Sequence, residues 1–287
     1  MAFISAPATL FTSTRGRAIS PRRSNHRATT PVMALNVLVT GAGGRTGRLV
    51  LESLVAAGDA YEATGLVRSK TRAKELMEET YNKVEALLTE GDITKEETLR
   101  EPLKGKDALV ILTSAVPKMN PPVEGQAPSF YYEEGGMPET VDWHGAKRQI
   151  DLAIEAGVKH VVLVGSMGST DDANQLNRIG NGNILRFKRK AELYLIGSGV
   201  DYTIINPAGL CNEEPGKREL VVGHNDELFT VYGRGTIPRK DVARVVMSAL
   251  STEKARNKAF DILALPIGDG TPTADVVPLF DSTGPDL

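Results

Sequence analysis

Cysteine is almost absent from this chain, since Cys211 is the only one among 287 residues. A single cysteine excludes an internal disulfide and any metal site built from several thiolates. No apolar stretch approaches the roughly 18 residues that indicate a membrane-spanning helix. The four histidines show no metal-ligand spacing. We therefore predict neither a metal centre nor an integral membrane segment.

Acidic residues are missing from the first 51 positions, and Glu52 is the first of them. Residues 1–33 instead carry five arginines among nine serines and threonines. This Arg-rich, Ser-rich and acid-poor composition is typical of an organelle transit peptide. We predict a cleaved, disordered transit peptide over 1–33, with the chloroplast as first choice and the mitochondrion as second. An ordinary disordered tail is the alternative.

A strong positive charge is also missing. The whole chain has a net charge of -2, and without the five arginines of 1–33 the remainder is near -7. The basic run 186–190 lies on a predicted helix within this acidic remainder. Because nucleic-acid binding depends on positive charge, we predict no nucleic-acid partner.

The most informative pattern lies at 37–50, where an apolar strand enters Gly41-x-x-Gly44-x-x-Gly47 and a helical pattern follows. The first glycine permits a tight turn, the second admits phosphates, and the third lets the helix approach the strand. The helix N-terminus then offers N–H groups and a positive dipole end to an anion. A glycine-rich loop without a ligand is the alternative. We predict that a pyrophosphate is bound by Gly41, Ala42, Gly43, Gly44, Arg45, Thr46 and Gly47.

Strand and helix patterns alternate from residue 36 onward, which predicts an α/β fold. Continuous apolar runs favour a Rossmann-like, doubly wound parallel sheet, and we add a small C-terminal cap. We assign 34–287 to a single domain, with cap segments at about 206–238 and 263–287. Strands are predicted at 36–40, 63–67, 84–89, 108–113, 161–164, 202–205 and 259–262, and helices at 46–58, 71–79, 140–156, 187–196 and 240–250.

Long segments without regular patterns follow three of these strands, at 114–139, 165–182 and 206–238. Loops of such length are usually functional or disordered. All three leave the carboxyl edge of the sheet, where doubly wound folds bind their ligands. Any reaction site is therefore expected among these loops.

The residues after the second strand indicate which dinucleotide would bind. Arg68 follows Gly47 by 21 residues, close to the offset of about 20 at which a ribose-contacting residue is expected. No acid stands beside it, and an arginine there suits the 2′-phosphate of NADP, with Arg45 as a second contact. A solvated surface role for Arg68 is the alternative. Asp92 is predicted to accept the adenine amino group, or else to cap the segment that begins at Ile93.

Five motifs together resemble one family: Thr40-Gly41-x-x-Gly44-x-x-Gly47, Gly91-Asp92-Ile93-Thr94, Val164-Gly165-Ser166-Met167-Gly168, Lys188-Arg189-Lys190-Ala191-Glu192 and Tyr202-Thr203-Ile204-Ile205. They are similar to the atypical short-chain dehydrogenase/reductases of the NmrA-like, NAD(P)-binding group, and most of all to plant chloroplast members. The resemblance covers about residues 36–285. It implies NADP(H) as the cofactor, with the glycine loop on its pyrophosphate, Arg68 on the 2′-phosphate and Asp92 on the adenine.

The resemblance also implies an active site. Ser166 would lie near the nicotinamide, and Lys188 matches the lysine of the Tyr-x-x-x-Lys pair in active short-chain enzymes; both are our predicted catalytic residues. Two positions depart from the family. Ile184 replaces the catalytic tyrosine, and Asn206 replaces a usual arginine. Further cofactor contacts implied by the resemblance are Ile93, Thr113, Ser114, Ala115, Pro207, Ala208, Gly209 and Leu210.

Because isoleucine carries no transferable proton, a donor would have to come from elsewhere. Tyr131 and Tyr132 in the segment 114–139 are candidates, although aromatic anchoring of that segment is the alternative. Ser166 could polarise a carbonyl or could be a turn residue. Cys211 has no histidine near it in sequence and is expected to be a small core or loop thiol.

Two functions are compatible with these residues. The first is a NADP(H)-dependent oxidoreductase that reduces a small carbonyl or enone, which the long loops favour. The second is a non-catalytic NADP(H)-binding redox sensor or assembly module, which Ile184 favours. We favour the oxidoreductase. Fold analogy alone does not decide between the two functions. The expected partners are a small-molecule substrate and either a second copy of the chain or another chloroplast protein.

Overall fold

Parallel strands form the centre of the structure, a computed structural model that describes residues 1–2 and 34–283. The central strands follow the order β3-β2-β1-β4-β7-β8-β12, and each neighbouring pair in this run is parallel. This order reverses between β1 and β4, which makes that gap the switch point of the sheet. The strands are β1 (Leu35–Thr40), β2 (Tyr61–Val67), β3 (Leu88–Glu90), β4 (Ala108–Ile111), β7 (His160–Val164), β8 (Asp201–Pro207) and β12 (Lys258–Ala264).

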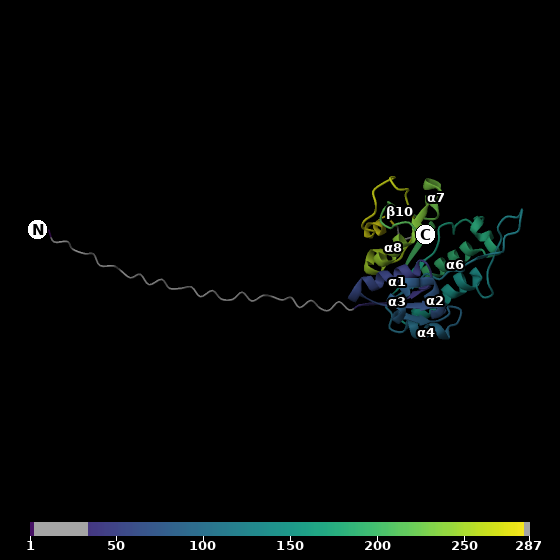
Figure 1. Ribbon diagram of the computed structural model, residues 1–287, viewed down its shortest axis with the longest axis horizontal. Coiled ribbons are helices and arrows are strands. Elements are labelled where there is room, and N and C mark those ends of the chain that lie inside the picture. Colours follow the sequence, from purple (N-terminus) through teal and green to yellow (C-terminus); the bar gives the residue numbers. More distant parts are fainter. Residues whose placement is uncertain (3–33, 284–287) are drawn as a thin grey trace. The chain divides into compact units, whose positions relative to one another are not determined.

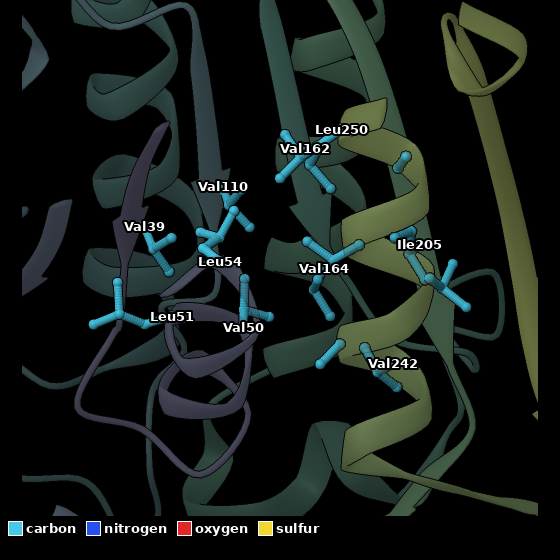
Figure 2. Close-up of a cluster of buried hydrophobic side chains, with 14 of the residues drawn as sticks. Val39, Val50, Leu51, Leu54, Val110, Val162, Val164, Ile205, Val242 and Leu250 are labelled. Carbon is cyan, nitrogen blue, oxygen red and sulfur yellow. The ribbon is translucent and has the colours of Figure 1, made fainter. Parts of the chain in front are cut away.

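Helices cover both faces of this sheet. On one face α1 (Gly47–Ala56) lies beside α8 (Arg239–Ser251), and Figure 2 shows their valines and leucines against Val39, Val110 and Val164 of the strands. The other face is covered by α4 (Glu97–Leu103), α5 (Ala146–Glu155) and α6 (Ile184–Ile196) (Figure 1). Successive side chains of β1 alternate between the two layers. The predicted α/β, Rossmann-like fold is confirmed.

One predicted strand, 84–89, is wrong in its first half. There the chain forms α3 (Tyr81–Val84) and a 3-10 turn, η3 (Glu85–Leu87), before β3 begins. The reason is the spacing of the apolar side chains: Tyr81, Val84 and Leu88 are buried at intervals of three and four, which is a helical period. The preceding helix is α2 (Lys70–Met77), close to the predicted 71–79.

The segment 206–238 is more regular than the sequence suggested. It contains β9 (Gly209–Cys211), β10 (Leu220–Gly223), α7 (Glu227–Tyr232) and β11 (Thr236–Pro238). β10 and β11 pair antiparallel with β12, and β9 pairs parallel with β11, so these strands extend the main sheet. The assignment of one domain with cap segments stays a prediction.

Two short strands, β5 (Lys118–Met119) and β6 (Phe130–Tyr131), form a separate hairpin within the long segment after β4. A π-helical segment, η4 (Glu139–Gly145), then leads directly into α5. The remaining turns of 3-10 helix are η1 (Gly58–Ala60), η2 (Glu78–Thr80), η5 (Gln175–Asn181), η6 (Glu253–Ala255) and η7 (Val277–Asp281).

The predicted transit peptide, 1–33, lies outside the described residues apart from its first two. Within the part of the chain that the structure describes, no helix has both the length and the apolar character needed to cross a membrane.

Candidate cofactor and active site

The glycine loop between β1 and α1 is built for close contact. A Cβ atom on Gly47 would lie 2.1 Å from the carbonyl oxygen of Gly41, and one on Gly41 would lie 2.7 Å from the oxygen of Leu112. Gly41 also has a φ of +71°, which favours glycine. Thr46, the N-cap of α1, forms no side-chain cap bond, while the Arg48 and Leu49 amides donate to the carbonyls of Gly44 and Thr46, each at 3.0 Å. The helix start therefore offers an anion chiefly its positive dipole end. The loop therefore fits the pyrophosphate that the sequence predicts there.

The predicted adenosine contacts lie at the ends of β2 and β3. Arg68 is exposed directly after β2. Asp92 accepts hydrogen bonds from the Thr94 amide at 2.9 Å and from its hydroxyl at 2.8 Å. Burial opposes ionisation of Asp92, but these bonds and the nearby Arg68 charge hold its pKa below the ordinary value. One Asp92 oxygen thus orders the turn at Thr94, but it caps no helix, because α4 begins at Glu97 with Glu96 as its N-cap. Ile93 is buried.

Lys188 is held by an acid that the sequence reasoning missed. The Nζ atom of Lys188 lies 2.8 Å from Oδ1 of Asp142, and the two side chains are only 13% and 1% exposed. The other oxygen of Asp142 accepts the Ala115 amide at 2.9 Å, just beyond β4. This pair therefore joins the start of α6, the helix before α5 and the switch-point edge. The available signal was an acid on the buried face of the predicted helix 140–156, in line with Gly145 and Gln149.

Thr113 and Ser114 lie at the same edge. Gln149 donates to the hydroxyl of Thr113 at 3.2 Å, which fixes the strand end against α5. Ser114 is exposed, whereas Ala115 is buried. A small cavity of about 10 Å³ is lined by Thr113, Asp142 and Lys188 together with Gly165. It has room for about one water molecule, so Thr113, one of the predicted cofactor contacts, and Lys188 border the same small cavity.

Ser166 begins the loop after β7 and is half-buried. Its hydroxyl donates to the carbonyl of Met167 at 3.0 Å. Asp226, in a left-handed conformation before α7, accepts the amides of Gly168 and Thr170, the second at 3.0 Å. This carboxylate therefore ties the Ser166 loop to the segment that follows β10.

The predicted cofactor contacts after β8 differ in burial. Pro207 ends β8, and Ala208 is buried with its amide bonded to Ile262 at 2.9 Å. Gly209 and Leu210 are exposed in β9. Together these residues border the loop of Ser166, since the Met167 amide donates to the Pro207 carbonyl at 3.1 Å.

Buried acids lie behind this edge. Glu192 is fully buried, and its Oε1 has no hydrogen-bond partner among the described residues. Burial raises the pKa of Glu192 to about 7, although the charge of Arg189, whose Nη1 is 3.2 Å from Oε2, acts in the opposite direction. A Cβ on Gly165 would meet this Oε1 at 2.6 Å and the Oδ1 of Asn206 at 2.1 Å. The Asn206 departure therefore lies beside Glu192, directly under the glycine before Ser166.

A second buried acid adjoins the first. Asp261 pairs with Asn206 across β8 and β12, and accepts the Asp226 amide at 2.6 Å. Burial, reinforced by the charges of Asp226 and Glu192, raises the pKa of Asp261 to about 7. Two buried carboxyl groups with raised pKa values therefore lie beneath the Ser166 loop.

The predicted alternative donors separate clearly. Tyr131 is 43% exposed, whereas the hydroxyl of Tyr132 is buried and has no hydrogen-bond partner among the described residues. Ile184 begins α6, and the free thiol of Cys211 lies half-buried in β9. Lys188 of α6 therefore lies against Asp142 of η4, whereas Cys211 lies in strand β9.

Comparison with known proteins decides the family. The sequence pattern of the NAD(P)H-binding family matches residues 41–253, from the first loop glycine to the turn after α8. The chain belongs to this NAD(P)H-binding family. The family binds NAD(P)H, which confirms the predicted nicotinamide dinucleotide cofactor. The family resemblance drawn from the five motifs is confirmed as well.

Similarity to individual proteins supports the assignment of the chain to this family. It is 48% identical over 269 residues to an uncharacterized chloroplastic protein of Arabidopsis thaliana, covering 93% of this chain and 80% of that one. It is 45% identical over 268 residues to sanguinarine reductase of Eschscholzia californica, covering 86% and 95%. A solved NAD-dependent epimerase/dehydratase-like structure from Bacillus halodurans superimposes with a TM-score of 0.64 at 25% identity, covering 85% and 99%.

Proposed function

We propose that this NAD(P)H-binding protein is a chloroplast reductase that uses NADPH to reduce a small carbonyl or enone. The observation that carries the proposal is the buried pair of Lys188 and Asp142, 2.8 Å apart at the switch-point edge. Removing a lysine and a carboxylate from water carries a desolvation penalty that can exceed the energy gained by pairing them, so stability alone gives little reason for this pair. Similarity to sanguinarine reductase over nearly its whole length supports reductase chemistry, and the chloroplastic relative supports the location.

The preference for NADPH over NADH rests on the end of β2. Arg68 is exposed where the adenosine ribose would lie. Its positive charge is also one of the influences that lower the pKa of Asp92, against the effect of burial. A guanidinium binds a phosphate through two parallel hydrogen bonds, while a ribose hydroxyl offers it no negative charge. We therefore assign Arg68 to the 2′-phosphate, with Arg45 of the glycine loop as its second contact.

Each proposed residue has a distinct task. Gly41, Gly44 and Gly47 let the loop and the start of α1 bind the pyrophosphate. When bound, the reduced nicotinamide supplies a hydride. Lys188, fixed by Asp142, binds ribose hydroxyls and places a positive charge near the reacting carbonyl. The remaining proposed contacts, which border the same edge, are Ala42, Gly43, Thr46, Ile93, Thr113, Ser114, Ala115, Ser166, Pro207, Ala208, Gly209 and Leu210.

The test is NADPH oxidation by the full chain with two probes, the dicarbonyl phenanthrenequinone and the enone 2-cyclohexenone. We expect turnover of at least one probe, and a loss of about 100-fold in kcat/KM for Lys188→Ala. Lys190→Ala is the matched control, because Lys190 lies on the same helix and contacts the Trp143 ring at 4.4 Å instead of Asp142. It should retain activity within about twofold.

Turnover that is equal in the Lys188 and Lys190 variants would contradict the assigned role. Tight NADPH binding without turnover of either probe would contradict the reductase and favour the sensor or assembly module.

A further inference from the structure

Tyr132 carries a polar group that the fold leaves unused. Its hydroxyl is buried and has no hydrogen-bond partner among the described residues. Native proteins keep few such groups, because a buried hydroxyl loses its bonds to water without gaining others. A substrate atom that enters the site can supply the missing partner.

The fold holds the ring of Tyr132 close to the start of α6. A Cβ on Gly182 would lie 2.4 Å from Cε2 of Tyr132, and a Cβ on Gly180 would lie 3.0 Å from the same ring. The β5–β6 hairpin that delivers Tyr132 is closed by the Asn120 amide, which donates to the Ser129 carbonyl at 2.9 Å. Gly182 precedes Ile184 by two residues. The ring therefore packs against the turn that leads into α6, two residues before the position from which the usual tyrosine is absent.

The hydroxyl of Tyr132 is also coupled to the lysine pair. Burial first, and then the charge of Asp142, raises the pKa of Tyr132 above its ordinary value. The same carboxylate lies 2.8 Å from Lys188 and accepts the Ala115 amide at 2.9 Å. Tyr132, Asp142 and Lys188 thus form one electrostatic group, although they come from three separate elements.

Tyr131 does not share this environment. It is the last residue of β6 and is 43% exposed. Tyr132 follows the end of this strand, and its ring packs against Gly180 and Gly182. The two candidates that the sequence left open are therefore distinguished by burial.

We propose that Tyr132 is the proton donor of this reductase and takes the place of the tyrosine missing at position 184. The inference rests on the proposed function. When the carbonyl carbon gains a hydride, its oxygen takes a proton from the Tyr132 hydroxyl. The phenolic O–H bond breaks and the O–H bond of the product alcohol forms. Lys188 then returns a proton to the tyrosinate and regains one from water, so charge and protons balance.

Asp142 of η4 is the charged group that acts on this hydroxyl. Lys188 of α6 joins the proposed group through Asp142, from which its Nζ lies 2.8 Å away. Other charged groups in the elements around it are turned to partners or to solvent: Glu133 pairs with Lys118, Arg186 pairs with Asp172 at 2.8 Å, and Arg178 is exposed.

Fluorine NMR on the full chain tests the placement without requiring turnover. Difluorotyrosine, which is more acidic than tyrosine, is incorporated at position 132, and its ionisation is followed against pH with and without NADP⁺. A positive nicotinamide ring near the phenol should lower its titration midpoint by about one pH unit or more. The same label at the matched position, Tyr131, should not move. A midpoint at 132 that ignores NADP⁺ would overturn the proposal.

Kinetics with phenanthrenequinone and NADPH then test the role. Tyr132→Phe should lower kcat by about 100-fold or more, with the KM for NADPH unchanged within about twofold. Tyr131→Phe should leave kcat within about twofold of the wild-type value. Wild-type kcat in Tyr132→Phe would overturn the proposal even if the reductase itself is real. An inactive wild-type chain would instead sink the proposed function, and the fluorine titration would still show whether Tyr132 faces the nicotinamide.

Discussion

Glu192→Gln should change how stability depends on pH. The carboxyl of Glu192 is fully buried, and burial raises its pKa from 4.5 to about 7, against the opposing charge of Arg189. The folded chain therefore holds this proton more tightly than the unfolded chain does. Its contribution to stability is complete below about pH 4.5 and is lost as the pH rises through about 7. Glutamine has nearly the same shape and does not titrate, so the variant lacks this loss.

The magnitude follows from the two pKa values. Between about pH 5 and about pH 8, a shift of this size lowers the free energy of unfolding of the wild type by about 2 to 3 kcal/mol. The difference in unfolding free energy, variant minus wild type, should therefore rise by a similar amount over the same range. Urea unfolding at several pH values measures this difference directly, because contributions from groups that do not interact with Glu192 cancel.

Glu155→Gln is the matched control. Its side chain is 57% exposed on α5, so its difference from the wild type should vary little with pH. A difference for Glu192→Gln that stays flat, or that falls as the pH rises, would refute the claim that this buried acid is protonated in the folded chain.

The remaining predictions concern the glycine loop and the lysine pair. Gly47→Ala places a methyl group 2.1 Å from a backbone oxygen and should weaken NADPH binding by about 100-fold. Gly197→Ala at the end of α6, whose Cβ would have no contact under 3.6 Å, should bind nearly as the wild type does in a fluorescence titration. Asp142→Asn leaves the Lys188 ammonium buried without its partner and should cost about 3 kcal/mol in urea unfolding. Asp281→Asn breaks an exposed pair with Lys254 and should cost less than about 1 kcal/mol; equal losses would contradict the reasoning.

Local patterns in the sequence were sufficient for the parallel core. The strands at 36–40, 108–113 and 161–164 are continuous apolar runs, and the structure places β1, β4 and β7 there. The glycine loop was equally readable, because Gly41 and Gly47 are needed for contacts between residues close in sequence. α4 was missed, because Pro102 in its last turn interrupts the helical pattern.

Long-range contacts account for what the sequence did not reveal. β10 and β11 are strands because they pair with β12, which comes later in the chain. Asp142 reads as an ordinary helix residue until Lys188 is folded against it, 46 positions later. Tyr131 and Tyr132 could not be separated in sequence either, since only the contacts of the ring with Gly180 and Gly182 decide which one is buried.

The measurement that tests the account most directly is a fluorescence titration of the full chain with NADPH and, in parallel, with NADH. We expect NADPH to bind at least about tenfold more tightly than NADH, a difference of about 1.4 kcal/mol. Arg68→Ala should abolish that preference, and Arg100→Ala, an exposed arginine on α4, should retain it. Failure to bind either nucleotide would contradict the central claim, and a preference that survives in Arg68→Ala would contradict the assignment of the 2′-phosphate.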